Sequence, residues 1–122
     1  MNINNIKRYL KEKPLCVSFF KNKDTTIYKV NGKIFAILST ETFPYIILKN
    51  EPFLNKALRE SFSFVFPAID VLNKMYWNTI ILVKDIDEDV ILSLIDRSYE
   101  LNIEDMNKRQ KRHYKYEIEE CS

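Results

Sequence analysis

Apolar residues recur along this chain with two different spacings. One spacing predicts strands, and the other predicts helices. Residues 25–30 and 33–39 are extended runs on either side of Asn31-Gly32. This pair suits a type I′ turn because both central positions of such a turn need positive φ. We therefore predict a β-hairpin here. The alternation of residues in its first strand predicts one buried and one wetter face. Ile27 and Lys29 share one of these faces, and Tyr28 and Val30 share the other.

Further apolar runs predict the rest of a sheet. Residues 15–20 precede the hairpin across a polar turn, residues 45–49 follow it, and both have the composition of strands. Residues 77–83 are predicted as a strand from their β-branched content. The run at 62–72 is apolar but is interrupted by Pro67, so its pattern leaves its structure open.

Three segments have apolar residues at helical spacing, namely residues 3–12, 50–61 and 85–102. A proline fits the first turn of the second helix, where a missing N–H is harmless. In the third, Asp85 and Glu88 have the spacing of a capping box. The predicted apolar positions are Ile3, Ile6, Tyr9 and Leu10, then Phe53, Leu54, Ala57 and Leu58, and finally Val90, Ile91, Leu94, Ile95 and Leu101.

The predicted order is a helix, three or four strands, a helix, a strand and a helix. This order favours an α+β domain built on an antiparallel sheet. A length of 122 residues suits one domain, which we assign to residues 1–103. Residues 104–122 carry few large apolar side chains, so we predict a charged C-terminal extension that is helical or partly disordered.

Composition narrows the class of protein. Apolar residues make up 46% and charged residues 30%, which is typical of a globular chain. The net charge is only +2, so a nucleic-acid role would need a local basic patch. Cys16 and Cys121 are far apart and belong to no Cys/His cluster, which argues against structural zinc and disulfides. No signal-like or membrane-length apolar run occurs, so we predict a cytoplasmic protein without a membrane segment.

Candidate catalytic groups are few. The single histidine is His113, so no metal site and no nucleophile–base pair is indicated. The acidic run Asp87, Glu88 and Asp89 is better explained by the charge preference of a helix N-terminus. The single glycine argues against Gly-rich phosphate loops. We therefore predict that the protein is not an enzyme and holds no cofactor.

Four short motifs occur in a fixed order along the chain. They read YKVNGKIFAIL (28–38), LKNEPFLNKALRE (48–60), NKMYWNT (73–79) and LIDRSYEL (94–101). Together they resemble the MmcQ/YjbR family of small bacterial proteins, and the resemblance covers residues 15–103. In that family the third motif reads Asn-Lys-x-His-Trp-Asn-Thr. This chain departs from it at Tyr76, which replaces the histidine, and it lacks the family's Tyr-His pair before Asn73.

The resemblance implies both a fold and a role. It implies a CyaY-like α+β fold, and it implies DNA binding by analogy with a double-wing arrangement of hairpins. The resemblance implies no enzymatic activity. Because one fold hosts many functions, these implications must be tested at a site.

The third motif holds the first candidate nucleic-acid contacts. Trp77 is either a core anchor that packs against the last helix or a platform on which a base stacks. Asn73 and Asn78 either bond backbone groups at a turn or reach phosphates and base edges. Lys74 is expected to face outward, where it would bind phosphate.

Basic residues also concentrate at the two ends of the chain. They are Lys7, Arg8, Lys11 and Lys13 near the start and Lys108, Arg109, Lys111 and Arg112 in the C-terminal extension. The extension could instead be a solvated end that complements the acidic last helix. Our first hypothesis is weak, sequence-independent binding of DNA or RNA through Lys74 and the extension. The alternative is a protein-interaction module without a nucleic-acid role.

Overall fold

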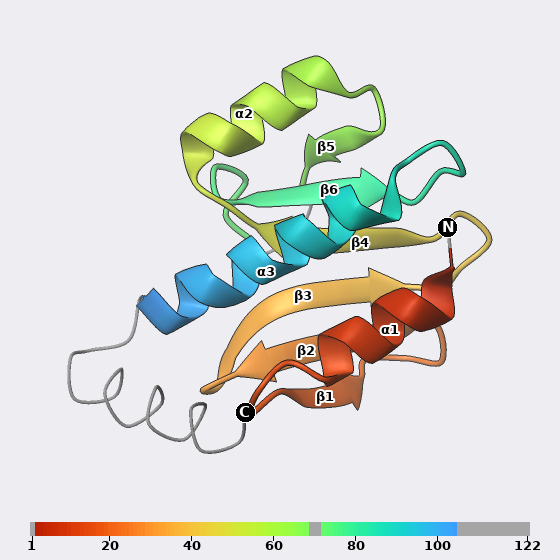
Figure 1. The fold of residues 1–122 in the computed structure, drawn as a ribbon, viewed down its shortest axis with the longest axis vertical. Coiled ribbons are helices and arrows are strands. Elements are labelled where there is room, and N and C mark those ends of the chain that lie inside the picture. Colours follow the sequence, from red (N-terminus) through yellow and green to blue (C-terminus); the bar gives the residue numbers. More distant parts are fainter. Residues whose placement is uncertain (1, 69–71, 105–122) are drawn as a thin grey trace.

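The structure is a computed structural model that describes residues 2–68 and 72–104. In this part of the chain three helices and six strands form an α+β fold (Figure 1). The helices are α1 (Ile3–Lys11), α2 (Pro52–Ser61) and α3 (Glu88–Glu104). The strands are β1 (Val17–Phe20), β2 (Thr25–Val30), β3 (Lys33–Ser39), β4 (Tyr45–Lys49), β5 (Val65–Pro67) and β6 (Trp77–Ile81). The predicted fold class is confirmed.

The six strands form one antiparallel sheet in the order β1-β2-β3-β4-β6-β5. The unassigned run 62–72 contains β5, a short strand that ends at Pro67 on the outer edge, where proline is tolerated because no further strand needs its N–H. The helices lie on one face of the sheet, with α1 and α3 in front of it in Figure 1. The opposite face carries no described helix.

The predicted hairpin is confirmed in detail. Asn31 and Gly32 have φ of 51° and 74°, as a type I′ turn requires. Tyr28 and Val30 are buried beneath the helices, at 4% and 1% exposure. Their alternation partners on β2 are half-buried on the opposite face. The predicted division of this strand into a buried and a wetter face is therefore confirmed, and the structure shows that Tyr28 and Val30 form the buried face.

Polar residues anchor α3 to the sheet. The β2–β3 register shifts next to Tyr28, which leaves carbonyl groups of β3 free to accept bonds from α3. Ser98 Oγ donates to the carbonyl of Phe35 at 2.5 Å, and Asn102 Nδ2 donates to that of Ile34 at 2.7 Å. Both side chains are thus buried, at 0% and 2% exposure. Val90 is 42% exposed, although it lines the same apolar pocket as Ile91 and Leu94.

Two predictions about helix ends and faces also need correction. The helix α3 begins at Glu88, and Asp87 Oδ1 accepts the N–H of Asp89 at 3.0 Å, so Asp87 rather than Asp85 caps it. On α2, Phe53 is 81% exposed, whereas the polar Asn55 is 1% exposed. The helix turns its polar residue inward because the sheet offers hydrogen-bond partners there.

No helix in the described part of the chain is long and apolar enough to cross a bilayer.

A chain that ends after Glu104 should still unfold cooperatively, with a melting temperature within a few degrees of the full chain. The reason is that Asn102 is the last residue that is buried among those described, and it would be retained. Thermal melts of the two chains check this. A second truncation after Leu101, which removes the Asn102 anchor together with partly buried Ile103, is the comparison and should cost at least about 1–3 kcal/mol. If the chain that ends after Glu104 no longer unfolds cooperatively, residues 105–122 contribute to the core.

Candidate nucleic-acid interface

The motif at residues 73–79 begins with a turn that its own asparagine holds. Asn73 Oδ1 accepts the N–H of Met75 at 2.9 Å. The Asn73 carbonyl accepts the N–H groups of Tyr76 and Trp77 at 3.1 and 3.0 Å. The side chain of Asn73 therefore has the backbone-bonding role that one interpretation of the sequence predicts.

Asn78 lies at the centre of a buried polar network between β6 and α2. Its Nδ2 donates to Asn55 Oδ1 at 3.0 Å, and its Oδ1 accepts from Arg59 Nε at 2.6 Å. Arg59 Nη2 also bonds the carbonyl of Lys74. Asn78 is 1% exposed, so its amide is committed to this network in the free protein.

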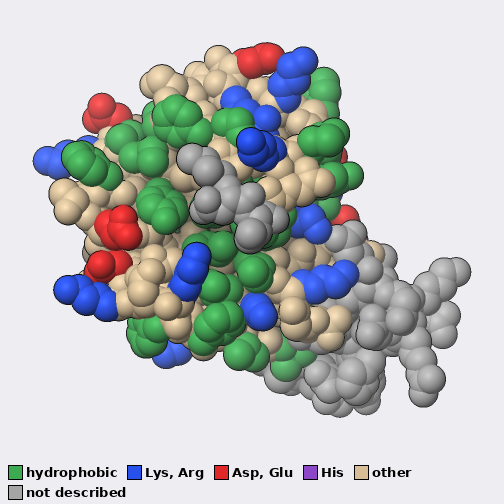
Figure 2. All heavy atoms as spheres, turned by 180° about the vertical axis from the view of Figure 1, so that it is seen from behind, with side chains coloured by type: hydrophobic (Ala, Val, Ile, Leu, Met, Phe, Trp, Pro, Cys, Tyr) green, Lys and Arg blue, Asp and Glu red, His purple; other side chains and the backbone are tan. Residues whose placement is uncertain are grey.

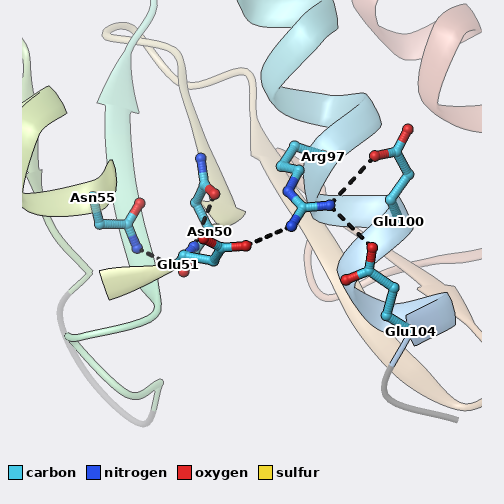
Figure 3. Close-up of polar contacts among 6 residues, drawn as sticks. All are labelled: Asn50, Glu51, Asn55, Arg97, Glu100 and Glu104. Carbon is cyan, nitrogen blue, oxygen red and sulfur yellow. Dashed lines mark hydrogen bonds and ion pairs between the residues drawn. The ribbon is translucent and has the colours of Figure 1, made fainter. Parts of the chain in front are cut away.

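A second set of polar contacts joins the start of α2 to α3 (Figure 3). Asn55 Nδ2 donates to the carbonyl of Asn50 at 3.2 Å, at the end of β4. The neighbouring Glu51 accepts from Arg97 Nη2 at 2.5 Å. Arg97 also bonds Glu104 at 3.2 Å, and these carboxylates raise the pKa of its guanidinium. These contacts hold the β4–α2 connection, and with it Asn55, against α3.

Trp77 is buried, at 8% exposure, but not against the last helix. Its neighbour Asn78 points to α2, so the alternation of β6 turns Trp77 to the face of the sheet that lacks helices. Hydrophobic side chains gather on that face, with Lys and Arg side chains between them (Figure 2). The predicted packing against α3 was therefore wrong, although the burial of the ring agrees with the core interpretation.

Lys74 is exposed, as expected, and forms no ion pair with a described residue. The candidate cations of the C-terminal extension, Lys108, Arg109, Lys111 and Arg112, lie outside the described residues.

A basic groove lies between α1 and the outer strands β1 and β2. We call it the α1 groove, and its volume is about 440 Å³. Its floor includes Phe20, which is 77% exposed, and the hydroxyl groups of Ser18 and Thr26. Its helical wall holds Asn4, Lys7, Arg8, Lys11 and Glu12. Three cations and one carboxylate thus line an open groove that has an aromatic ring on its floor.

The three cations of the α1 groove differ from Lys13 in their availability. Lys7, Arg8 and Lys11 are exposed, and none forms an ion pair with a described residue. Lys13 is paired with Asp96. Asp96 also accepts from the Tyr9 hydroxyl at 2.6 Å, and this bond raises the pKa of Tyr9 to about 12. Lys13 therefore fixes α1 to α3, whereas the other three cations remain open to solvent.

Groups suited to catalysis or metal binding are scarce in this part of the chain. No cluster of three His, Cys, Asp or Glu residues that could hold a metal ion occurs among the described residues. The Cys16 thiol is half-buried, and burial raises its pKa, which disfavours the nucleophilic thiolate. The arrangement is suited to binding anions through exposed cations.

Sequence reasoning found the cations of α1 but missed the floor of the groove. Ser18 and Phe20 belong to a predicted strand, and nothing in their local pattern indicates that α1 lies beside them. It also missed the structural role of Asn55 and Arg59. The helical period gave no signal for Asn55, because the apolar positions that it predicted on this helix were Phe53, Leu54, Ala57 and Leu58.

Comparisons with known proteins agree with the motifs. The family model YjbR matches residues 11–101. The Escherichia coli (strain K12) protein named "Uncharacterized protein YjbR" is 32% identical over 102 residues, which are 82% of this chain and 86% of the relative. The crystal structure of Deinococcus radiodurans DR2400, described as family-model domain DUF419, has a TM-score of 0.83 at 21% identity and covers 93% of this chain and 87% of its own.

A crystal structure of a Pseudomonas syringae protein is also similar. It has a TM-score of 0.69 at 26% identity and covers 83% of this chain and 98% of its own. The family model, the curated relative and the similar structures all match the main part of the chain. The chain therefore belongs to the YjbR family.

Proposed function

We propose that this protein is a non-enzymatic module that binds nucleic acids with low sequence specificity. The observation that carries the proposal is the α1 groove, which is lined by Lys7, Arg8 and Lys11 and by the exposed ring of Phe20. Lysine and arginine bind phosphates through charge, and an exposed aromatic ring can stack on any base. This combination is typical of surfaces that follow a nucleic-acid backbone.

The chemistry of the groove favours weak and general binding. Its hydroxyl groups, on Ser18 and Thr26, can bond phosphate or sugar but do not discriminate between bases. The Asn78 amide, which could read adenine, is bonded within the protein. We assign a supporting role to exposed Lys74 and to the cations of the C-terminal extension, which would add phosphate contacts.

Replacing the three groove cations by glutamine (Lys7→Gln, Arg8→Gln and Lys11→Gln) should weaken binding and flatten its salt dependence. Each lost phosphate contact lowers the slope of log affinity against log salt by about 0.7 for a single strand and about 0.9 for a duplex. The groove variant should therefore lose up to about two units of slope on a single strand. Fluorescence anisotropy with labelled single-stranded and duplex DNA across a salt series measures this.

The matched control removes three exposed cations elsewhere, by Lys33→Gln, Lys56→Gln and Lys84→Gln. It changes the net charge equally and should leave most of the slope intact. Two more variants, Lys74→Gln and the fourfold Gln substitution of the extension, measure the contributions of those cations. If the groove variant and the control variant lose equal amounts of slope, the effect comes from net charge and not from the groove. Absence of binding at low salt by the unaltered protein would overturn the proposal.

A second candidate function, protein interaction, is favoured by one other observation. An apolar pocket of about 250 Å³ lies between α2, β6 and the start of α3, and Phe62 at its rim is 39% exposed. Among the described residues, the charged ones that line it are Asp85 and Asp87. It is suited to an apolar side chain next to a cationic one. If the protein fails to bind nucleic acid at low salt, an apolar, basic peptide segment becomes the preferred ligand class.

A further inference from the structure

The outer strand β1 has the features of an edge that pairs with another strand. All four of its residues are exposed, and they include Val17, Phe19 and Phe20 at 63%, 44% and 77% exposure. The strand contains no proline and no charge, which are the usual protections of an edge. The other edge of the sheet, β5, has only three residues and ends in Pro67. The β5 edge is therefore protected against pairing with another strand, whereas the β1 edge is not.

The backbone groups at this edge can be assigned from the register. Lys21 N–H donates to the Thr25 carbonyl at 2.8 Å, so alternate residues of β1 bond β2. Phe19 and Val17 lie opposite Ile27 and Lys29 on that side. The N–H and C=O groups of Ser18 and Phe20 consequently point outward, with no partner among the described residues.

We propose that β1 pairs with β1 of a second copy of this chain in an antiparallel, two-fold arrangement. In the favoured register Ser18 lies opposite Phe20 of the second copy, which gives four backbone hydrogen bonds between the copies. Phe19 then lies directly opposite Phe19 of the second copy as a non-hydrogen-bonded pair. Aromatic side chains at such positions contact each other and stabilise the pairing.

A second copy suits this edge because the strand is self-complementary. The two-fold register sets Lys21 against the apolar Val17 of the second copy, so no like charges lie directly opposite each other on the paired strands. It also covers exposed apolar side chains on both faces, those of Val17 and Phe19 on one face and that of Phe20 on the other. An unrelated strand would have no equal reason to match this short apolar sequence.

Pairing at β1 would join two α1 grooves into one trough. Opposed residues of a sheet point to the same face, so the helices of both copies would lie on the same side. The two α1 helices would then flank a floor built from β1 and β2 of each copy, about four strands or about 19 Å wide at about 4.8 Å per strand. The trough would hold Lys7, Arg8 and Lys11 twice. This second half of the inference rests on the proposed function.

Light scattering after size exclusion, without nucleic acid, tests the pairing by itself. The unaltered chain should have twice the mass of one copy, and Ser18→Pro should have the mass of one. Proline removes an N–H that points away from β2, so the fold of each copy should survive, as a thermal melt would verify. Phe19→Lys should also give single copies, whereas Phe43→Lys, at a loop residue that is 78% exposed, should stay paired.

Cross-linking tests the register. In a background of Cys16→Ser and Cys121→Ser, Phe19→Cys should form a disulfide between two copies on mild oxidation, and Phe43→Cys should not. A single-copy mass for the unaltered chain at every concentration, or equal cross-linking of both cysteine variants, would overturn the pairing.

Nucleic-acid titration separates this inference from the proposed function. Ser18→Pro should lower the salt slope to about half, because each single copy then offers one groove, and the lost Ser18 hydroxyl takes no cation from that groove. An unchanged slope in a variant that is confirmed as single copies would overturn the joined trough. Absence of binding by the paired, unaltered chain would overturn the proposed function, while the mass and cross-linking results would still decide the pairing.

Discussion

Replacing Trp77 with alanine is expected to destabilise the fold by about 3–5 kcal/mol, the usual cost of truncating a buried tryptophan. The ring is 8% exposed and stands at the first residue of β6, where Lys49 of β4 lies opposite it. Its removal would leave a large void beside the central strands. Urea and thermal melts of the purified variant measure the loss.

The neighbouring Tyr76 provides a matched control, because it is 42% exposed and precedes the strand. Tyr76→Ala should cost less than about 1 kcal/mol, as expected for a surface substitution. If Trp77→Ala also costs less than about 1 kcal/mol, the ring is no core group. The interpretation of Trp77 as a base-stacking platform would then regain support.

The second large effect is expected at Asn78. Asn78→Ala should cost about 2–3 kcal/mol because it leaves the buried Asn55 Oδ1 without its donor and the half-buried Arg59 Nε without its acceptor. Thr79→Ala, at the next residue on the opposite face, is the control and should cost less than about 1 kcal/mol. Chemical denaturation gives both values.

A double-mutant cycle tests whether the network acts as a unit. Asn55→Ala and Asn78→Ala each remove one partner of the same side-chain hydrogen bond, so their combined cost should fall below the sum of the single costs by at least about 0.5 kcal/mol. Strict additivity of the two costs would contradict the view that Asn78 is committed to this network.

Local patterns predicted most elements because their causes are local. The Asn31-Gly32 turn follows from the φ angles that these two residues tolerate, and the buried face of β2 follows from a period of two. The α1 helix begins where Asn2 Oδ1 accepts the N–H of Asn4 at 2.9 Å, a local cap. The family motifs add the order of the elements, and the resulting α+β fold is confirmed.

Features that depend on distant partners were not predictable from local patterns. The residues Asn55, Ser98 and Asn102 are polar, yet they are buried, because carbonyl or amide groups from other elements complete their hydrogen bonds. Periodicity scores each residue by its own polarity, so it assigns such positions to the surface. For the same reason it placed Phe53, which is 81% exposed, on the apolar side of α2.

The features of the candidate site also fall into those that local sequence determines and those that depend on distant partners. By itself the sequence determined which residues carry positive charge, that the chain has one histidine, and that Lys74 follows a turn-forming asparagine. Only the tertiary structure decided that Lys7, Arg8 and Lys11 stand beside Phe20, and that Trp77 faces away from the helices. The physical reason is that charge and backbone preference belong to single residues, whereas a groove exists only once α1 has packed beside β1 and β2.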